Sequence, residues 1–180
     1  VRYPEDEAAH SWLPLLLDFH AVIDAGVRLG IEGQTAQGRT LACRSGCGSC
    51  CRTHLDIPIY PHELVGLYWF LAEKLEGPAR LTVRRALVSH LSGRACPFLV
   101  NNKCAVHVMR PAACRQFNVF GSPCAEGEDA YHTRRDDVLT PLRDYVDTAF
   151  YLSAPFYGLN TDAERRDAVA RLERQAASLE

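Results

Sequence analysis

The run Cys43-Arg44-Ser45-Gly46-Cys47-Gly48-Ser49-Cys50-Cys51 holds four of the eight cysteines of this chain in one short stretch. The other four follow singly at Cys96, Cys104, Cys114 and Cys124. Buried structural cysteines behave like other small apolar residues, so a core does not need this clustering. Thiolates that bind a metal do need it, and soft sulfur ligands at short spacing select zinc, copper(I) or an iron–sulfur cluster. The sequence therefore predicts a metal site, and all eight cysteines are candidate ligands.

The spacing within the run indicates how its thiols could share a metal. Cys47 and Cys50 have the two-residue gap found in zinc and iron–sulfur motifs. The side chains of adjacent Cys50 and Cys51 diverge, so either one of them lies outside the ligand set or the site is polynuclear. Eight thiols also exceed the four of one structural zinc, and two zinc ions or a four-thiolate cluster with spare cysteines would use more of them. The first-choice ligands are Cys47, Cys50, Cys104 and Cys114, and the weakest candidate is Cys124.

Other uses of cysteine account for this pattern less well. Eight cysteines could pair fully as disulfides, but a chain of 180 residues with 47% hydrophobic residues does not need such links. No export signal is visible, so we expect a cytoplasmic protein with reduced thiols. Inert buried thiols could account for Cys96 or Cys124 but not for the run at 43–51. A redox-sensing pair would need only two cysteines.

Composition limits the classes of partner. The formal net charge of -2 gives no electrostatic argument for binding nucleic acid or an anionic membrane. No segment reaches the roughly 18 apolar residues of a membrane span. We therefore expect a metal ion or cluster as the ligand, no nucleic acid and no membrane, with a protein partner left open. The chain also lacks a phosphate-binding loop and the common hydrolase and zinc-protease motifs.

Hydrophobic periodicity predicts a mainly α-helical fold. Apolar residues from Trp12 to Val27 recur at helical spacing, and Gly30 and Gly33 are expected to end that helix. Asn101-Asn102 suits the tight turn of a small β-hairpin over 97–107. Further helices are expected over 61–77, 79–91, 110–115, 139–152 and 162–179, a short extended segment over 55–59, and a loop over 121–136. We expect one compact domain over residues 1–180, with its cysteine motif at 41–124.

Few residues besides cysteine are candidates for the metal site. His54 follows the cysteine run and His107 follows Cys104, so each could reach a metal, whereas the other histidines fit packed or exposed positions. Arg110 and Arg115 flank Cys114 and could donate hydrogen bonds to thiolates. The alternative for both arginines is pairing with acids on the surface.

These motifs resemble those of the YkgJ-type cysteine-cluster family, which is described as a zinc- or iron-chelating domain. The similarity covers Cys43-x3-Cys47-Gly48-x-Cys50-Cys51, then Cys96-Pro97-Phe98-Leu99, then Cys104-x-Val106-His107-x-x-Arg110-Pro111-x-x-Cys114-Arg115. His107 stands where the family usually has tyrosine. Flagellin lysine methylases carry a similar motif, for which an iron–sulfur cluster is implied. That resemblance favours iron–sulfur over zinc, but it does not carry over the methylase activity, because nothing here resembles a methyl-donor site.

The resulting hypothesis is a metal-binding protein that holds an iron–sulfur cluster through its cysteines, with zinc as the alternative. As an enzyme, it would use the cluster as a redox or group-transfer centre. As a binding module, it would hold zinc structurally or carry it to a partner. A closed site with four protein ligands would indicate a structural metal, and an open coordination position would indicate a reactive one.

Overall fold

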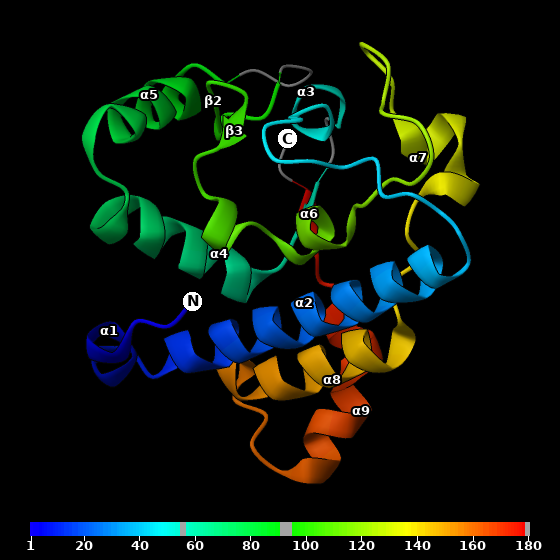
Figure 1. Cartoon of the computed structure of the whole chain (residues 1–180). Helices are drawn as coiled ribbons and strands as arrows, with labels where there is room; N and C mark the ends of the chain where they lie inside the picture. The colour runs from blue at the N-terminus through cyan, green and yellow to red at the C-terminus, as the bar shows by residue number, and fades with distance from the viewer. Residues whose placement is uncertain (55–56, 91–94, 179–180) are drawn as a thin grey trace.

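A computed structural model describes residues 1–54, 57–90 and 95–178. Its central element is the long helix α2 (Trp12–Ala36), which packs most extensively against α8 (Arg143–Ser153). Figure 1 shows α8 along one side of α2, with α4 and α6 on the other. The short elements α3 (Cys50–Thr53), β2 (Leu99–Val100) and β3 (Lys103–Cys104) lie beyond α4 and α6, so α2 and α8 form a helical base beneath them.

The helix predicted from Trp12 does not stop at Gly30 and Gly33, because α2 continues through both. That expectation is wrong, and packing gives the reason for one of these glycines. A Cβ on Gly30 would lie 3.0 Å from Leu139 Cδ1, and a Cβ on Gly26 would lie 2.7 Å from Tyr145 Cβ. Glycine at these two positions lets the segment around α8 approach the helix axis closely. The small cost of glycine within a helix is offset by that contact.

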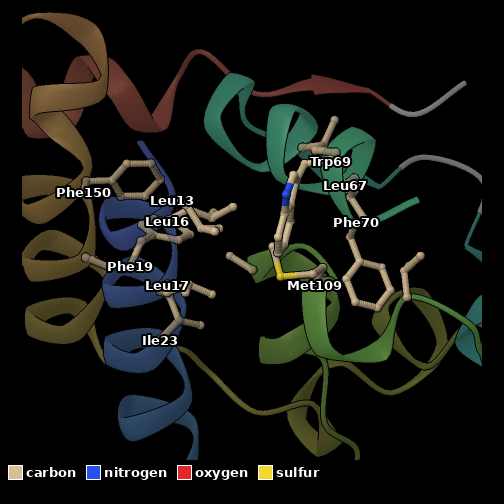
Figure 2. Close-up of a cluster of buried hydrophobic side chains, with 14 of the residues drawn as sticks. Leu13, Leu16, Leu17, Phe19, Ile23, Leu67, Trp69, Phe70, Met109 and Phe150 are labelled. Atoms are coloured by element: carbon tan, nitrogen blue, oxygen red, sulfur yellow. The ribbon is translucent and has the colours of Figure 1, made fainter. Parts of the chain in front are cut away.

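The core forms where α2 faces α4 and α8. Leu13, Leu16, Phe19 and Ile23 repeat on one face of α2 and are almost fully buried. Figure 2 shows these side chains facing Phe150 from α8 on one side and residues from α4 and its continuation on the other, namely Leu67, Trp69 and Phe70, together with Met109. Each such side chain contributes about 1.5–3 kcal/mol when fully buried. The apolar stripe predicted from the sequence is therefore the centre of the fold.

The middle helices follow the predictions closely. α4 (Pro61–Trp69) begins with proline in its first turn and continues as the π-helix η1 (Phe70–Lys74). α5 (Gly77–Val88) matches the helix expected over 79–91, although Leu91 lies outside the described residues. Val83 alone is buried on α5, so that helix is anchored on one narrow face.

The predicted hairpin is present, with shorter strands than expected. β2 (Leu99–Val100) pairs antiparallel with β3 (Lys103–Cys104). Asn101 and Asn102 have φ of 50° and 61°, the left-handed conformation that asparagine tolerates in tight turns. His107 is not in a strand; it begins the 3₁₀ helix η2 (His107–Met109).

A second strand pair was not predicted. β1 (Pro58–Ile59) pairs antiparallel with β4 (Ala177–Ser178) near the end of the chain. The extended segment expected over 55–59 is thus present at Pro58 and Ile59, and Leu55 and Asp56 lie outside the described residues. The last helix, α9 (Asp162–Glu173), ends earlier than the predicted residue 179. Thr161 caps its start, with its hydroxyl accepting from the Glu164 N–H.

Three further departures concern local structure. α1 (Pro4–Ala9) precedes the first predicted helix. The segment 121–136, expected to be loop, contains α7 (Ala130–Thr133), which forms because the Asp129 side chain caps it by accepting from the Tyr131 N–H. α8 begins at Arg143 rather than at residue 139. The remaining short elements are the 3₁₀ helices η3 (Arg135–Asp137) and η4 (Ala154–Tyr157), and the mainly helical class with one small hairpin is confirmed.

Candidate metal centre

The cysteine run is fixed at its start by a backbone pairing that the sequence did not predict. Ala42 N–H donates to Val119 O over 2.8 Å, and Gly121 N–H donates to Thr40 O over 2.8 Å. This pairing places Cys43 beside Val119, whose N–H donates to Cys43 Sγ over 3.3 Å. A backbone N–H directed at sulfur stabilises the thiolate form that binds metal.

The run then folds against the hairpin turn. Gly48 has φ of 59°, and a Cβ there would lie 3.3 Å from Asn102 O, so both the left-handed backbone and the close approach favour glycine. Arg52 links the two segments, since its Nη1 donates to Asn102 Oδ1 over 3.1 Å and its Nη2 donates to Cys47 O over 3.2 Å. Cys50 and Cys51 begin the single-turn helix α3 (Cys50–Thr53) that follows.

Three of the four distal cysteines come from a loop, a strand and a helix. Cys96 N–H donates to Cys51 O over 2.8 Å, which holds the two residues side by side. Cys104 is the last residue of β3. Cys114 lies in the first turn of the short helix α6 (Ala112–Gln116), which corresponds to the helix expected over 110–115 and has Pro111 at its N-cap.

Five thiols form one neighbourhood around α3. A hydrogen bond with the Cys51 thiol, together with burial, raises the pKa of Cys50 strongly. The same contact lowers the pKa of Cys51, but its hydrogen bond with Cys96 and its burial outweigh this and raise that pKa to about 11. The contact with Cys51 lowers the pKa of Cys96. Burial raises the pKa values of Cys104 and Cys114, and the nearby thiols add to both shifts.

Cys43, Cys47 and Cys124 form a second neighbourhood, which Cys50 also approaches. Cys43 and Cys124 pack against the small apolar cluster of Val119, Ala130 and Val138. Burial raises the pKa of Cys43 and of Cys124, and the thiols of Cys50 and Cys47 also raise the pKa of Cys43. Arg134 Nη2 donates to Cys124 Sγ over 3.7 Å, and the Cys47 thiol donates to Ser49 Oγ over 3.4 Å.

The chemistry of this donor set fits a soft metal. All eight cysteines are unpaired thiols that are neither fully buried nor fully exposed. Val119 N–H and Arg134 are already aimed at sulfur, and Arg110 lies close enough to lower the pKa of Cys104. In the part of the chain that the structure describes, no three histidine, cysteine or acidic side chains are grouped closely enough to hold a metal ion as they stand. Ligand binding would thus deprotonate these thiols and draw them together.

The histidine and arginine candidates have other partners. His54 Nε2 lies 3.0 Å from Asp129 Oδ1, and its ring packs edge-on against Phe117. His107 Nε2 contacts the guanidinium of Arg110.

Arg115 does not donate to a thiolate. It is buried, and it donates to Asp24 Oδ2 over 2.7 Å, to Val108 O over 2.6 Å and to Arg110 O over 2.9 Å. It thereby fixes α6 against α2 rather than acting on sulfur. The alternative of pairing with an acid is confirmed for Arg115, since Asp24 is half-exposed, although Arg115 itself is buried.

The sequence predictions missed several residues that shape the site. Asp129 and Arg134 come from the segment expected to be loop, where no periodic pattern marks them. Glu63 was also missed, although proline at the start of α4 with glutamate two residues later is a typical helix start. Its carboxylate accepts the Ala112 N–H at the start of α6.

We compared the chain with known proteins and protein families, and one family model supports metal binding. No helix among the described residues is both long and apolar enough to cross a membrane. No curated protein and no solved structure matches the chain. One family model, CxxCxxCC, described as "Putative zinc- or iron-chelating domain", matches residues 42–137, more than half of the chain and all eight cysteines. The match supports metal binding, and the chain belongs to the CxxCxxCC family.

Proposed function

We propose that this protein binds an iron–sulfur cluster through its cysteine thiolates. The observation that carries the proposal is the neighbourhood of Cys50, Cys51, Cys96, Cys104 and Cys114, which offers more sulfur than one tetrahedral zinc can use. Cysteine thiolates are the usual ligands of such clusters. The sequence resemblance to flagellin lysine methylases points the same way.

Cys47, Cys50, Cys104 and Cys114 are the first choices as ligands from the sequence. Cys50, Cys104 and Cys114 belong to the group of five, whereas Cys47 lies near Cys43 and Cys124 and would have to move toward that group when the cluster binds. When bound, the cluster would supply redox or group-transfer chemistry. The protein's own contribution is to orient the thiolates and to direct positive groups at them. The Val119 N–H, Arg110 and Arg134 offset the negative charge that accumulates when several thiolates share one site.

Zinc is the second candidate, because the eight thiols form two groups that could each hold one zinc ion. Cys50 lies near both groups, since its thiol raises the pKa of Cys43 in the group of three and of Cys114 in the group of five. Eight thiolates would satisfy two closed tetrahedral zinc sites. Zinc held in this way would be structural, or would be carried to a protein partner.

The nature of the metal is tested by purifying the protein under anaerobic conditions. We expect a brown protein with charge-transfer absorption in the visible range and with both iron and acid-labile sulfide. A colourless protein that holds zinc and no sulfide would reject the cluster and support the zinc alternative. Reconstitution with iron and sulfide after chelation separates a lost cluster from one that never binds.

Single serine substitutions test the ranking of the ligands. Replacing a true ligand should remove most of the bound metal, whereas replacing a cysteine that only supports the site should lower affinity about 10–100-fold. We expect Cys47→Ser and Cys114→Ser to fall in the first group and Cys124→Ser in the second. Full metal occupancy in Cys47→Ser with an empty site in Cys124→Ser would reverse the ranking. Eight harmless substitutions would rule out metal binding by the cysteines.

A further inference from the structure

Glu63 is a fully buried carboxylate that joins three helices. It lies on α4 with 1% of its surface exposed. Its Oε1 accepts the Ala112 N–H of α6 over 2.6 Å and lies 3.3 Å from His20 Nε2 on α2. Its Oε2 accepts the Tyr60 N–H over 3.2 Å at the start of its own helix.

Burying this carboxylate lowers the stability of the folded state. Burial raises the pKa of Glu63 and lowers the pKa of His20, so both charged forms are disfavoured there. An apolar side chain of similar size would often be as stable or more stable at such a position. The carboxylate does have one capacity that an apolar residue lacks, which is to accept two backbone N–H groups from different segments at once.

The segment that Glu63 holds carries a cysteine. α6 has only five residues and cannot be stable through its own hydrogen bonds. Two contacts fix it to α4 and α2. Glu63 on α4 accepts the N–H of its first residue, Ala112, and Arg115 donates to Asp24 on α2. Cys114 lies between these two anchors.

We propose that Glu63 is a positioning residue for Cys114, which it acts on through the Ala112 N–H to hold the thiol toward the other cysteines. The inference rests on the proposed function, since it assigns Glu63 a role in assembling that site. Glu63 does not itself ligate the metal. The orientation of Cys114 is set from α4 and α2, the helices of the apolar core.

Glu63→Gln is the sharpest test, because it keeps the volume and replaces one acceptor oxygen by an NH₂ group. Both carboxylate oxygens face backbone N–H groups, so the amide nitrogen must confront one of these donors. In the full chain loaded with iron and sulfide, we expect Glu63→Gln to lower metal affinity in chelator competition about 10–100-fold. The matched control is Glu73→Gln, at an exposed position on η1, which should leave affinity unchanged.

A double-mutant cycle with Cys114→Ser separates positioning from a general loss of structure. If Glu63 acts through Cys114, adding Glu63→Gln to Cys114→Ser should cause no further loss of affinity. An equal loss in both backgrounds would overturn the proposal, as would wild-type affinity in Glu63→Gln. Should Glu63→Gln fail to fold by circular dichroism, Glu63→Met, which suits a buried apolar site, enters the same cycle with the same expectations.

A measurement on metal-free protein keeps this inference distinct from the cluster proposal. Without Glu63, α6 should open locally, and Cys114 should react with iodoacetamide roughly 10-fold faster or more, the factor expected for losing one charge-assisted hydrogen bond. The rate at Cys43 should not change. Unchanged alkylation of Cys114, or equal acceleration at all eight cysteines, would overturn the positioning role. If the wild-type protein holds zinc or no metal, the cluster proposal fails, and this measurement still decides the role of Glu63.

Discussion

At the scale of single residues, the core contains polar groups that an apolar interior normally excludes. His62 is almost fully buried, with its Nδ1 2.6 Å from the Tyr157 hydroxyl. Its Nε2 has no hydrogen-bond partner in the described part of the chain. Burial lowers the pKa of His62 to about 4, because a charged imidazolium would be poorly solvated there. The fold therefore requires this histidine to be neutral.

This requirement predicts acid sensitivity. The unfolded chain binds a proton at His62 below about pH 6.5 while the folded chain does not until about pH 4, so stability is lost as pH falls through that window. The contribution is at most about 3 kcal/mol. Unfolding by urea at pH 7 and pH 5 measures about 2 kcal/mol of it. His62→Gln should reduce the difference without abolishing it, because burial also lowers the pKa of His20, which is unchanged in the variant. The raised pKa of Glu63 has the opposite effect on stability, and it does so equally in the wild type and in His62→Gln. The control is His132→Gln, at an exposed side chain, which should leave the stability difference between pH 7 and pH 5 unchanged.

At the scale of elements, glycines set how closely the helices pack. Gly66 on α4 faces α2, and a Cβ there would lie 2.0 Å from Leu16 Cδ2 and 3.1 Å from Met109 Cε. Gly33 on α2 is exposed, with nothing within 4 Å of a Cβ built on it. Two glycines in helices thus have opposite requirements.

The pair predicts opposite effects of alanine. Gly66→Ala should destabilise the protein by about 1–3 kcal/mol, because α4 and α2 must separate to admit the methyl group. Gly33→Ala should stabilise it by about 0.5–1 kcal/mol through the better helix propensity of alanine. Thermal unfolding by circular dichroism compares the two. A neutral Gly66→Ala would mean that Leu16 can move aside at no cost, and the close α2–α4 contact would then not be required.

The elements also show what could be predicted from the sequence. Local signals found α2, α4, α9 and the Asn101-Asn102 hairpin, because periodicity and turn residues act within a few positions. Pairings between distant segments left no such signal. The contact of Val119 with the residues before Cys43 and the pairing of β1 with β4 are examples.

The candidate site divides in the same way. The cysteines could be named as ligand candidates because clustered thiols at short spacing are typical of metal sites. The groups that hold them could not be named. Glu63 is distant in sequence from Ala112, and Arg134 comes from a segment that no periodic pattern marks. Arg115 shows the reverse error, because its position next to Cys114 indicated a thiolate contact and the fold directs it to Asp24 instead.

At the scale of the whole molecule, the helices α2 and α8 and the segments that carry the cysteines are stabilised by different means. Helices α2 and α8 share an apolar core that includes Phe19, Ile23 and Phe150. Every residue from 41 to 54 is at least partly exposed, so burial contributes little to that segment. Burial stabilises residues 95–125 more than residues 41–54. The segment carries four cysteines, but it also contains buried residues such as Met109 and Phe120. The order of residues 41–54 must come from other contacts, and the bound metal is the largest one available.

Metal removal should therefore loosen the protein unevenly. Metal–thiolate binding contributes about 10–16 kcal/mol of apparent free energy in small zinc domains, and losing it should affect the least buried segment most. After chelation, we expect amide protection to fall strongly over residues 41–54, partly around β2, β3 and α6, and little in α2 and α8, which serve as internal references. Hydrogen exchange read by mass spectrometry on loaded and stripped protein measures all of these in one sample. Equal protection of residues 41–54 in both forms would contradict this, because Arg52 and the backbone contacts would then hold the segment without metal. A uniform loss of protection across α2 and α8 would show that the apolar core is not stable without the metal.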